Sequence, residues 1–281
     1  MPELPEVEVL AQHLRPLLRG RSVRRVDVRR PRVLRPTSPD QFTARMLGAK
    51  FLGLQRRGKY LLFEMMPARS GKKFAVLGHL GMTGRMFLAS KTDAPPKHAA
   101  VVLNLGPQNF IYEDVRYFGR MTLDLSALES LGPEPLDSSF TLKAFAEALK
   151  RSRQAVKVKL LDQKVVAGVG NIYASEALFR AGISPRLPAH RLTRAQVERL
   201  RRGIRQVLKR AIRFGSTIPL NFSTHKSDGL FYYGSGGNGE KHYAERLRVY
   251  DRAGQPCPRC GAPIKRIVQA ARSTFYCPKC Q

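Results

Sequence analysis

The first eight residues of the chain bring together the groups needed for amine catalysis. Removal of Met1 would leave Pro2 with a free secondary amine, a nucleophile that condenses with an aldehyde carbon to give a cationic iminium. Glu3 and Glu6 lie beside it in the sequence, one as a candidate general acid or base and the other as an electrostatic partner. Acidic residues are also ordinary at a helix N-terminus, where they complement the helix dipole. Spacing alone therefore leaves both interpretations open.

The cysteines form a second chemical pattern. All four lie in the last 25 residues as two Cys-x-x-Cys pairs with sixteen residues between them: Cys257, Cys260, Cys277 and Cys280. Each pair can present two sulfurs to one metal, and the spacer suits a β-hairpin, so we expect one structural Zn²⁺. Four protein ligands leave no position for a water, so this metal is expected to hold the fold rather than to catalyse. The alternative is two structural disulfides, which would suit an exported protein.

The charge of the chain is concentrated in blocks. Its 281 residues include 50 Lys and Arg against 21 Asp and Glu, a net charge of +29. Residues 1–60, 143–213 and 241–281 carry +9, +14 and +7, whereas residues 61–142 are neutral. This pattern favours a polyanion, and nucleic acid in particular, over a uniformly basic surface. No apolar run approaches the roughly 18 residues of a membrane span, and the acidic start is unlike a secretory signal. We therefore expect a cytoplasmic, nucleoid-associated protein with no membrane partner.

Apolar spacing predicts the elements of the N-terminal half. A helix is expected from Val7 to Leu18, kinked or ended early at Pro16 and stopped at Gly20. After this helix the residue pattern changes to short runs typical of β-strands, which are separated by turns of Gly, Pro, Asn and charged residues. These runs cover residues 50–54, 60–65, 74–80, 99–105 and 110–113. Many short strands with little helix predict a β-sandwich or barrel.

Helical spacing returns in the second half. It covers residues 142–149 and a longer run after Thr193, where Gln196 completes a capping-box pattern and Gly215 ends the run. We expect an α+β multidomain protein. Its parts are an N-terminal helix with a β-sandwich (1–135), a helical domain (136–223), a loop (224–245) and a zinc β-hairpin (246–281).

Six short segments carry a family resemblance from end to end. They are PELPEVE at 2–8, RGKYL at 57–61, HLGMTG at 79–84, DVRYFG at 114–119, GVGNIYASE at 168–176 and RSTFYC at 272–277. In this order they resemble the formamidopyrimidine-DNA glycosylases, bacterial repair enzymes for oxidised purines. The resemblance implies a helix-two-turn-helix element in the helical domain. It also implies a monomer that acts on double-stranded DNA containing oxidised bases or abasic sites.

The resemblance implies catalytic roles for Pro2, Glu3, Glu6, Lys59 and Arg272. Pro2 would attack the anomeric carbon of the damaged nucleotide, and Glu3 would donate and shuttle protons. Lys59 would be a hairpin lysine near the scissile phosphate and the acid in β-elimination, although by type alone it could equally be a solvated strand lysine. Arg272, on the zinc hairpin, would grip the flanking phosphates and serve as donor in δ-elimination.

The resemblance also implies a set of DNA-binding residues. Met82, Arg116 and Phe118 would fill the gap that a flipped nucleotide leaves in the stack, although outside their motifs Met82 and Phe118 would be taken for core residues. Asn171 would contact a phosphate at a helix N-terminus whose backbone amides are free. The remaining implied contacts are His79, His98, Arg151 and Lys157.

Three hypotheses for function follow. The first is a bifunctional DNA glycosylase and abasic-site lyase that excises 8-oxoguanine and formamidopyrimidines and nicks the strand by β,δ-elimination. The second is the same scaffold with a preference for oxidised pyrimidines. The third is a non-catalytic zinc-hairpin DNA-binding protein. Residues 222–245 look longer than is usual in the family, with a glycine-rich insertion at 234–239, where the lesion-capping loop should lie.

Overall fold

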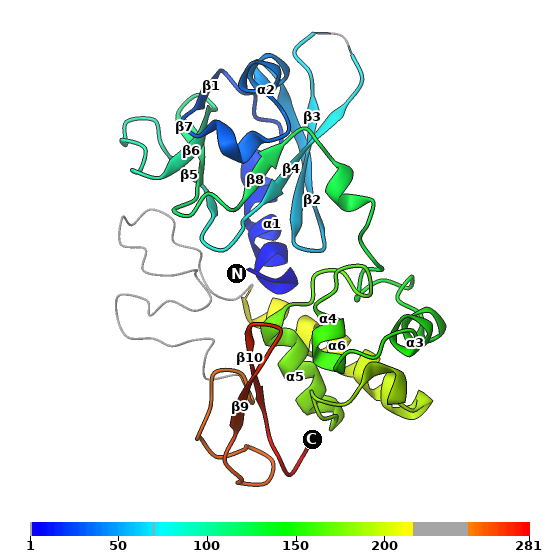
Figure 1. Cartoon of the computed structure of the whole chain (residues 1–281). Coiled ribbons are helices and arrows are strands. Elements are labelled where there is room, and N and C mark those ends of the chain that lie inside the picture. Colours follow the sequence, from blue (N-terminus) through cyan, green and yellow to red (C-terminus); the bar gives the residue numbers. More distant parts are fainter. Residues whose placement is uncertain (1, 70, 216–246) are drawn as a thin grey trace. The chain divides into compact units, whose positions relative to one another are not determined.

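The computed structural model describes residues 2–69, 71–215 and 247–281, and these form two units (Figure 1). The first unit contains residue 2 and residues 6–129, and the second contains residues 3–5, 130–215 and 247–281. The expected lesion-capping loop at 224–245, its insertion and the last residues of the expected helical domain lie outside the described residues. None of the described helices is long and apolar enough to cross a membrane.

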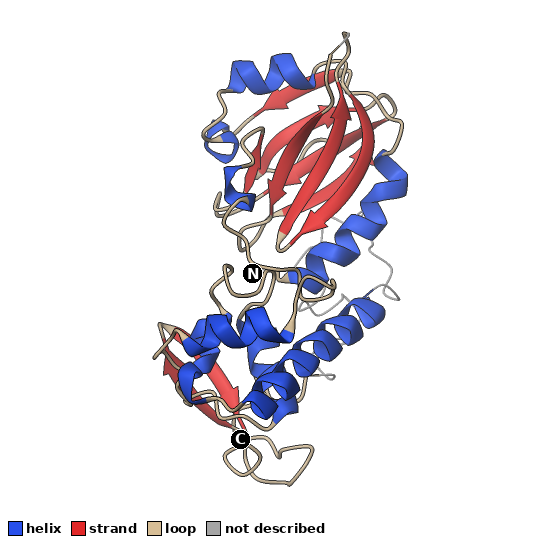
Figure 2. Cartoon of the chain, turned by 90° about the vertical axis from the view of Figure 1, so that its right-hand side faces the viewer, coloured by secondary structure: helices blue, strands red, loops and turns tan. Residues whose placement is uncertain are grey.

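The first unit is an antiparallel β-sandwich. One sheet has the order β2-β3-β4-β8 and the other β1-β6-β7-β5, and Figure 2 shows the two stacked face to face. The strands are β1 (Arg25–Val28), β2 (Lys50–Arg57), β3 (Tyr60–Met66), β4 (Phe74–His79), β5 (Arg85–Ser90), β6 (Ala99–Asn104), β7 (Gln108–Glu113) and β8 (Arg120–Thr122). Along β3 every second residue is buried, the period expected of a strand with one face on a core.

The five expected strands are confirmed as β2, β3, β4, β6 and β7. The strands β1, β5 and β8 were not predicted, nor was helix α2 (Pro39–Met46). Two 3₁₀ helices, η1 (Pro31–Leu34) and η2 (Ser126–Leu128), complete this unit.

Helix α1 (Leu4–Leu18) packs on the core of the sandwich, where Leu14 and Leu18 are buried. The prediction that the helix ends early at Pro16 is wrong, because the helix continues to Leu18, and a kink at Pro16 stays a prediction. Proline removes only one backbone N–H, and near the end of this helix the burial of Leu14 and Leu18 offsets that loss. Gly20, at φ +83°, then turns the chain in the left-handed conformation that favours glycine.

The second unit consists of helices and one hairpin. Its elements are α3 (Leu142–Lys150), α4 (Val156–Leu160), α5 (Asn171–Ala181), η3 (Ala189–Arg191), α6 (Arg194–Gly215), β9 (Lys265–Gln269) and β10 (Arg272–Tyr276). Helix α6 starts where its capping box predicts. The backbone N–H of Gln196 donates to Thr193 Oγ1 at 3.2 Å, and the Thr193 N–H donates to Gln196 Oε1 at 2.9 Å.

Candidate active site and DNA-binding surface

Pro2 and Glu6 are buried at the start of the first unit, and Lys59 is only 6% exposed in the turn between β2 and β3. The alternative of a solvated strand lysine is therefore wrong. Gly58 precedes Lys59 at φ +57°, so the tight turn needs a residue that tolerates the left-handed region. The sandwich thus holds the candidate lysine on a short, buried hairpin turn.

An ion pair fixes this hairpin to α1. Arg56 Nε donates to Glu8 Oε2 at 2.7 Å, and Arg56 Nη1 donates to the carbonyl of Gly58 at 3.1 Å. The guanidinium therefore links the helix that follows Pro2 to the turn that carries Lys59. No pattern in the sequence marks Arg56 and Glu8 as a pair, because they lie 48 positions apart.

Met82, Arg116 and Phe118, the residues expected to fill the gap left by a flipped nucleotide and here called the wedge residues, lie on two adjacent loops of the sandwich. Met82 is 39% exposed and Phe118 is 50% exposed, so the alternative that they are core residues is wrong. The Arg116 guanidinium lies over the Phe118 ring, 5.2 Å from its centroid. A Cβ added to Gly81 would lie 2.6 Å from the backbone nitrogen of Gly119, so the loops approach this closely only because Gly81 has no side chain. Exposed apolar groups beside a cation suit insertion into a base stack.

Asp114, which the sequence analysis did not single out, organises these two loops. Its buried carboxylate accepts a 2.6 Å hydrogen bond from Thr83 Oγ1 and a 2.8 Å bond from the Gly119 N–H. The Arg116 N–H donates to the same carboxylate at 3.3 Å. Thr83 belongs to the loop of Met82, and Gly119 closes the loop of Phe118. One carboxylate thus ties both loops into a single rigid element.

The two candidate histidines have different surroundings. Burial, followed by the charges of Lys59 and Arg120, lowers the pKa of His79 to about 4, so its ring is neutral at pH 7. The His79 Nδ1 accepts the Gly81 N–H at 3.2 Å, which leaves Nε2 as the donor. His98 is half-buried, and its Nδ1 lies 3.4 Å from the hydroxyl of Tyr117 on the wedge loop.

In the second unit, the Glu3 carboxylate caps helix α5. Its Oε2 accepts the N–H of Gly170 at 2.8 Å and of Tyr173 at 3.3 Å, and its Oε1 accepts that of Ile172 at 2.9 Å. The expectation of free amides for a phosphate is therefore wrong at these three positions, because a buried side chain from a distant part of the sequence already occupies them. A Cβ on Gly170 would lie 2.3 Å from Glu3 Cδ, so the cap requires glycine there.

A basic cluster lies beside this cap. Lys157 is fully buried, and its Nζ donates to Asn171 Oδ1. Asn171 Nδ2 donates to the Ser273 carbonyl at 2.9 Å, which connects the helices to strand β10. Burial, followed by the charge of Arg272, lowers the pKa of Lys157 to about 8, while Glu3 opposes the shift. Lys157, Asn171 and Arg272 are thus held together, in a place suited to one phosphate group.

Two residues that were not predicted from the sequence, Tyr250 and Glu176, support the elements around this cluster. One predicted residue, Arg151, shows no hydrogen bond to it in the part of the chain that the structure describes. Tyr250 packs against Phe275 of β10 at 5.1 Å between ring centroids and hydrogen-bonds to Asn171. The buried Glu176 carboxylate accepts the backbone N–H groups of residues 248–250. Arg151 is exposed at the end of α3, and the described residues show no hydrogen bond between its side chain and the basic cluster.

The four cysteines converge at the base of the β9–β10 hairpin. Their sulfur atoms all lie within 4.8 Å of one another, with 3.9 Å between Cys257 and Cys280 and 3.4 Å between Cys260 and Cys277. Sulfur atoms bound tetrahedrally at about 2.3 Å from Zn²⁺ would show similar spacings. All four cysteines are free and their sulfurs gather at one point, so the residues fit one structural zinc rather than two disulfides. The metal holds the hairpin that carries Arg272.

Comparison with known proteins matches three parts of the chain to known domain families. Residues 1–121 match the formamidopyrimidine-DNA glycosylase N-terminal domain, residues 131–222 its H2TH domain, and residues 254–281 a zinc finger found in FPG and IleRS. The formamidopyrimidine-DNA glycosylase of Symbiobacterium thermophilum is 41% identical over 290 residues, covering 100% of this chain and 89% of that protein.

Solved structures of a Lactococcus lactis relative share the fold. One, bound without a covalent link to DNA with an abasic site, has a TM-score of 0.84 and 33% identity, and the match covers 99% of both chains. Another, bound to DNA with an oxidised pyrimidine, has a TM-score of 0.85 and 32% identity, covering 100% of this chain and 99% of that one. These matches favour an enzyme over the hypothesis of a non-catalytic DNA-binding protein.

Proposed function

Since the chain belongs to the formamidopyrimidine-DNA glycosylase family, whose members are glycosylases with abasic-site lyase activity, we propose that it excises oxidised purines from duplex DNA and then nicks the strand. The observation that carries this proposal is the setting of Glu3. Its carboxylate is fixed by three backbone N–H groups, and it directly follows Pro2, the residue whose nitrogen would attack. A fixed carboxylate next to an amine supplies a nucleophile and a proton carrier at one place.

The proposed reaction begins at the Pro2 nitrogen. Its lone pair forms a bond to C1′ of the flipped nucleotide, and the C1′–N glycosidic bond breaks with its electron pair leaving on the base, which takes up the proton that the Pro2 nitrogen loses. Glu3 carries the proton that opens the sugar ring at O4′, and the iminium between Pro2 and C1′ results. Loss of a proton from C2′ then expels the 3′ phosphate, with Lys59 as the proposed acid. Arg272 is the proposed donor when the 5′ phosphate leaves in the second elimination.

Extrusion of the base needs compensation, because unstacking costs a few kcal/mol. We assign that role to Met82, Arg116 and Phe118, the exposed group that Asp114 holds in place. The thioether and the ring can fill the vacated stack, and the guanidinium can hydrogen-bond the orphaned base. The phosphates beside the lesion would be bound by Lys157, Asn171 and Arg272.

Borohydride trapping tests the proposal. Reduction of the iminium should link the protein irreversibly to DNA that contains 8-oxoguanine, and N-terminal mass spectrometry should place the link on Pro2 with Met1 absent. Pro2→Gly should abolish trapping, whereas Pro188→Gly, at the residue before η3 in the second unit, should trap normally if it folds. A protein that retains Met1 and still incises damaged DNA at full rate contradicts the proposed nucleophile.

A preference for oxidised pyrimidines is the second candidate, because the Lactococcus lactis relative has been solved with DNA that contains such a lesion. Excision of 8-oxoguanine opposite cytosine, measured beside excision of thymine glycol on matched duplexes, separates the two. Faster release of thymine glycol would favour the second candidate.

The proposal extends to the state of the protein in the cell. A net charge of +29 supports association with the nucleoid as a monomer, without a membrane partner. Fluorescence microscopy of a C-terminally tagged protein and sedimentation analysis test these two points.

A further inference from the structure

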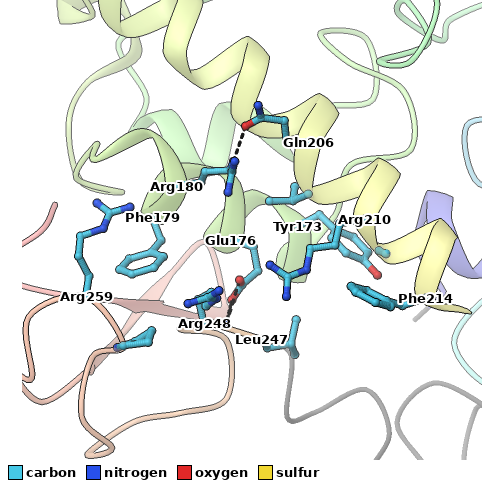
Figure 3. Close-up of a pocket in the computed structure, with 13 residues that line it drawn as sticks. Tyr173, Glu176, Phe179, Arg180, Gln206, Arg210, Phe214, Leu247, Arg248 and Arg259 are labelled. Atoms are coloured by element: carbon cyan, nitrogen blue, oxygen red, sulfur yellow. Dashed lines mark hydrogen bonds between the residues drawn. The ribbon is translucent and has the colours of Figure 1, made fainter.

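A pocket of about 280 Å³ lies within the second unit, between α5, α6 and the segment that leads into the zinc hairpin (Figure 3). Its apolar lining comes from side chains of both helices and of that segment: Tyr173, Phe179, Val207, Ala211, Phe214, Leu247 and Pro258. The volume lies just below the range for small-molecule sites, which is about 300–1,000 Å³. It suits the base and sugar of a single nucleotide, with the phosphates at the surrounding arginines.

Four arginines surround this pocket: Arg180, Arg210, Arg248 and Arg259. They come from α5, from α6, from the segment after residue 247 and from the first Cys-x-x-Cys pair. Figure 3 shows Arg180, Arg210 and Arg248 approaching from different sides, with Arg259 beside Phe179. Guanidinium groups bind phosphate in a bidentate manner and also stack on planar rings, so this set is chemically suited to a ligand with both parts.

Contacts within the pocket hold two of these guanidiniums in place. Arg259 lies over the Phe179 ring at 4.7 Å from its centroid, and Arg210 lies over the Phe214 ring at 5.3 Å. Arg180 is hydrogen-bonded to Gln206, a neutral partner that leaves its charge uncompensated by that contact. Fixing the side chains before a ligand arrives reduces the entropy that binding must offset.

The pocket has one acidic side chain among the described residues that line it, Glu176. Its carboxylate accepts the backbone N–H groups of Arg248, Val249 and Tyr250 at 2.9–3.1 Å and so anchors the pocket wall. The four guanidiniums around the pocket belong to exposed arginines, and with one carboxylate in this structural role an entering anion would meet an excess of positive charge. The charge balance therefore points to a multiply charged anion.

We propose that this pocket is a binding site for a free nucleoside phosphate, with the phosphates held by the four arginines and the base lying on the apolar lining. The site is composed only of residues of the second unit, and its four arginines are not among the catalytic and DNA-binding residues described above. Binding there would join α5, α6 and the start of the zinc hairpin through one ligand.

Calorimetric titration of the zinc-loaded full chain with adenosine 5′-diphosphate tests this site, at about 0.15 M salt so that diffuse surface attraction is screened. We expect one site per chain. Adenosine, which lacks the phosphates, and inorganic pyrophosphate, which lacks the nucleoside, should each bind at least about tenfold more weakly than adenosine 5′-diphosphate. Pyrophosphate binding as tightly as the diphosphate, or no binding of the diphosphate at millimolar concentration, would overturn the proposal.

Matched variants separate the pocket from the general charge of the protein. Arg210→Gln with Arg259→Gln should weaken binding of the diphosphate by about 30-fold or more, because two charged hydrogen-bond donors are lost. Arg194→Gln with Arg202→Gln removes the same charge from exposed positions on α6 outside this pocket and should bind as the wild type does. Equal loss in both pairs would overturn the proposal. Borohydride trapping on lesion DNA, measured for each variant, shows that the protein remains folded and active.

Discussion

Substitution of Glu3 by glutamine should destabilise the DNA-free protein, not only inactivate it. Glutamine has one acceptor oxygen where glutamate has two, and both glutamate oxygens accept N–H groups at the start of α5. Whichever way the amide turns, its NH₂ group faces at least one of the donors on Gly170, Ile172 and Tyr173. One buried N–H without a partner costs about 1–3 kcal/mol, and the remaining bonds lose the strength that a charged acceptor gives.

A loss of about 2–3 kcal/mol in the free energy of unfolding follows, equivalent to a fall in Tm of about 5–10 °C for a unit of this size. Scanning calorimetry without DNA measures it. Glu3→Ala should lose more, since all three N–H groups lose their partner, and Glu198→Gln, at an exposed position of α6, should unfold close to the wild type. If Glu3→Gln unfolds at the wild-type temperature, the carboxylate does not cap α5 and the reasoning fails.

Three further outcomes are expected. Phe118→Ala should change the free energy of unfolding by less than about 1 kcal/mol, since the ring is 50% exposed. The same variant should bind a lesion duplex at least about tenfold more weakly in a gel-shift titration. A large loss of stability with normal binding would instead make Phe118 a core residue. Removal of zinc by a chelator, followed with a chromogenic zinc indicator, should abolish tight DNA binding because the hairpin that holds Arg272 loses its support; normal binding by metal-free protein contradicts this. Lys157 carries its charge below its pKa of about 8 and loses it above, so DNA affinity should fall between pH 7 and 9, with proton uptake on binding. Lys157→Arg should flatten this pH dependence of the affinity. Identical pH profiles for the wild type and the variant would show that Lys157 binds no phosphate.

Features with a local signal were predicted from the sequence. The two Cys-x-x-Cys pairs, the capping box at Thr193 and the β-like run of residues 60–65 each depend on residues a few positions apart, and each is confirmed. Helix α2 had a similar signal that was overlooked. Ser38 and Gln41 form a capping box in which the Gln41 N–H donates to Ser38 Oγ at 3.2 Å and the Ser38 N–H donates to Gln41 Oε1 at 3.3 Å.

The organisation of the site was beyond such signals, because the decisive contacts join distant parts of the chain. Glu3 bonds to Gly170 across 167 positions, Arg56 to Glu8 across 48, and Thr83 to Asp114 across 31. No periodicity marks these pairs, and each carboxylate could equally have been solvated. The sequence therefore indicated candidate residues for the chemistry but not the residues that hold them in position, and Asp114 and Glu176 were missed for this reason.

The cap on α5 changes how this protein must bind a phosphate. A helix N-terminus normally attracts phosphate through its free amides, but here the Glu3 carboxylate already occupies three of them and adds a negative charge. Attraction must then come from Lys157 and Arg272, and each disfavours the charge of the other while no anion is present. A bound phosphate relieves this repulsion and favours the protonated lysine, so DNA binding and charging of Lys157 reinforce each other. Because Glu3 is also the proposed proton carrier, the residue that keeps phosphate from the helix N-terminus is the one that the reaction needs beside Pro2.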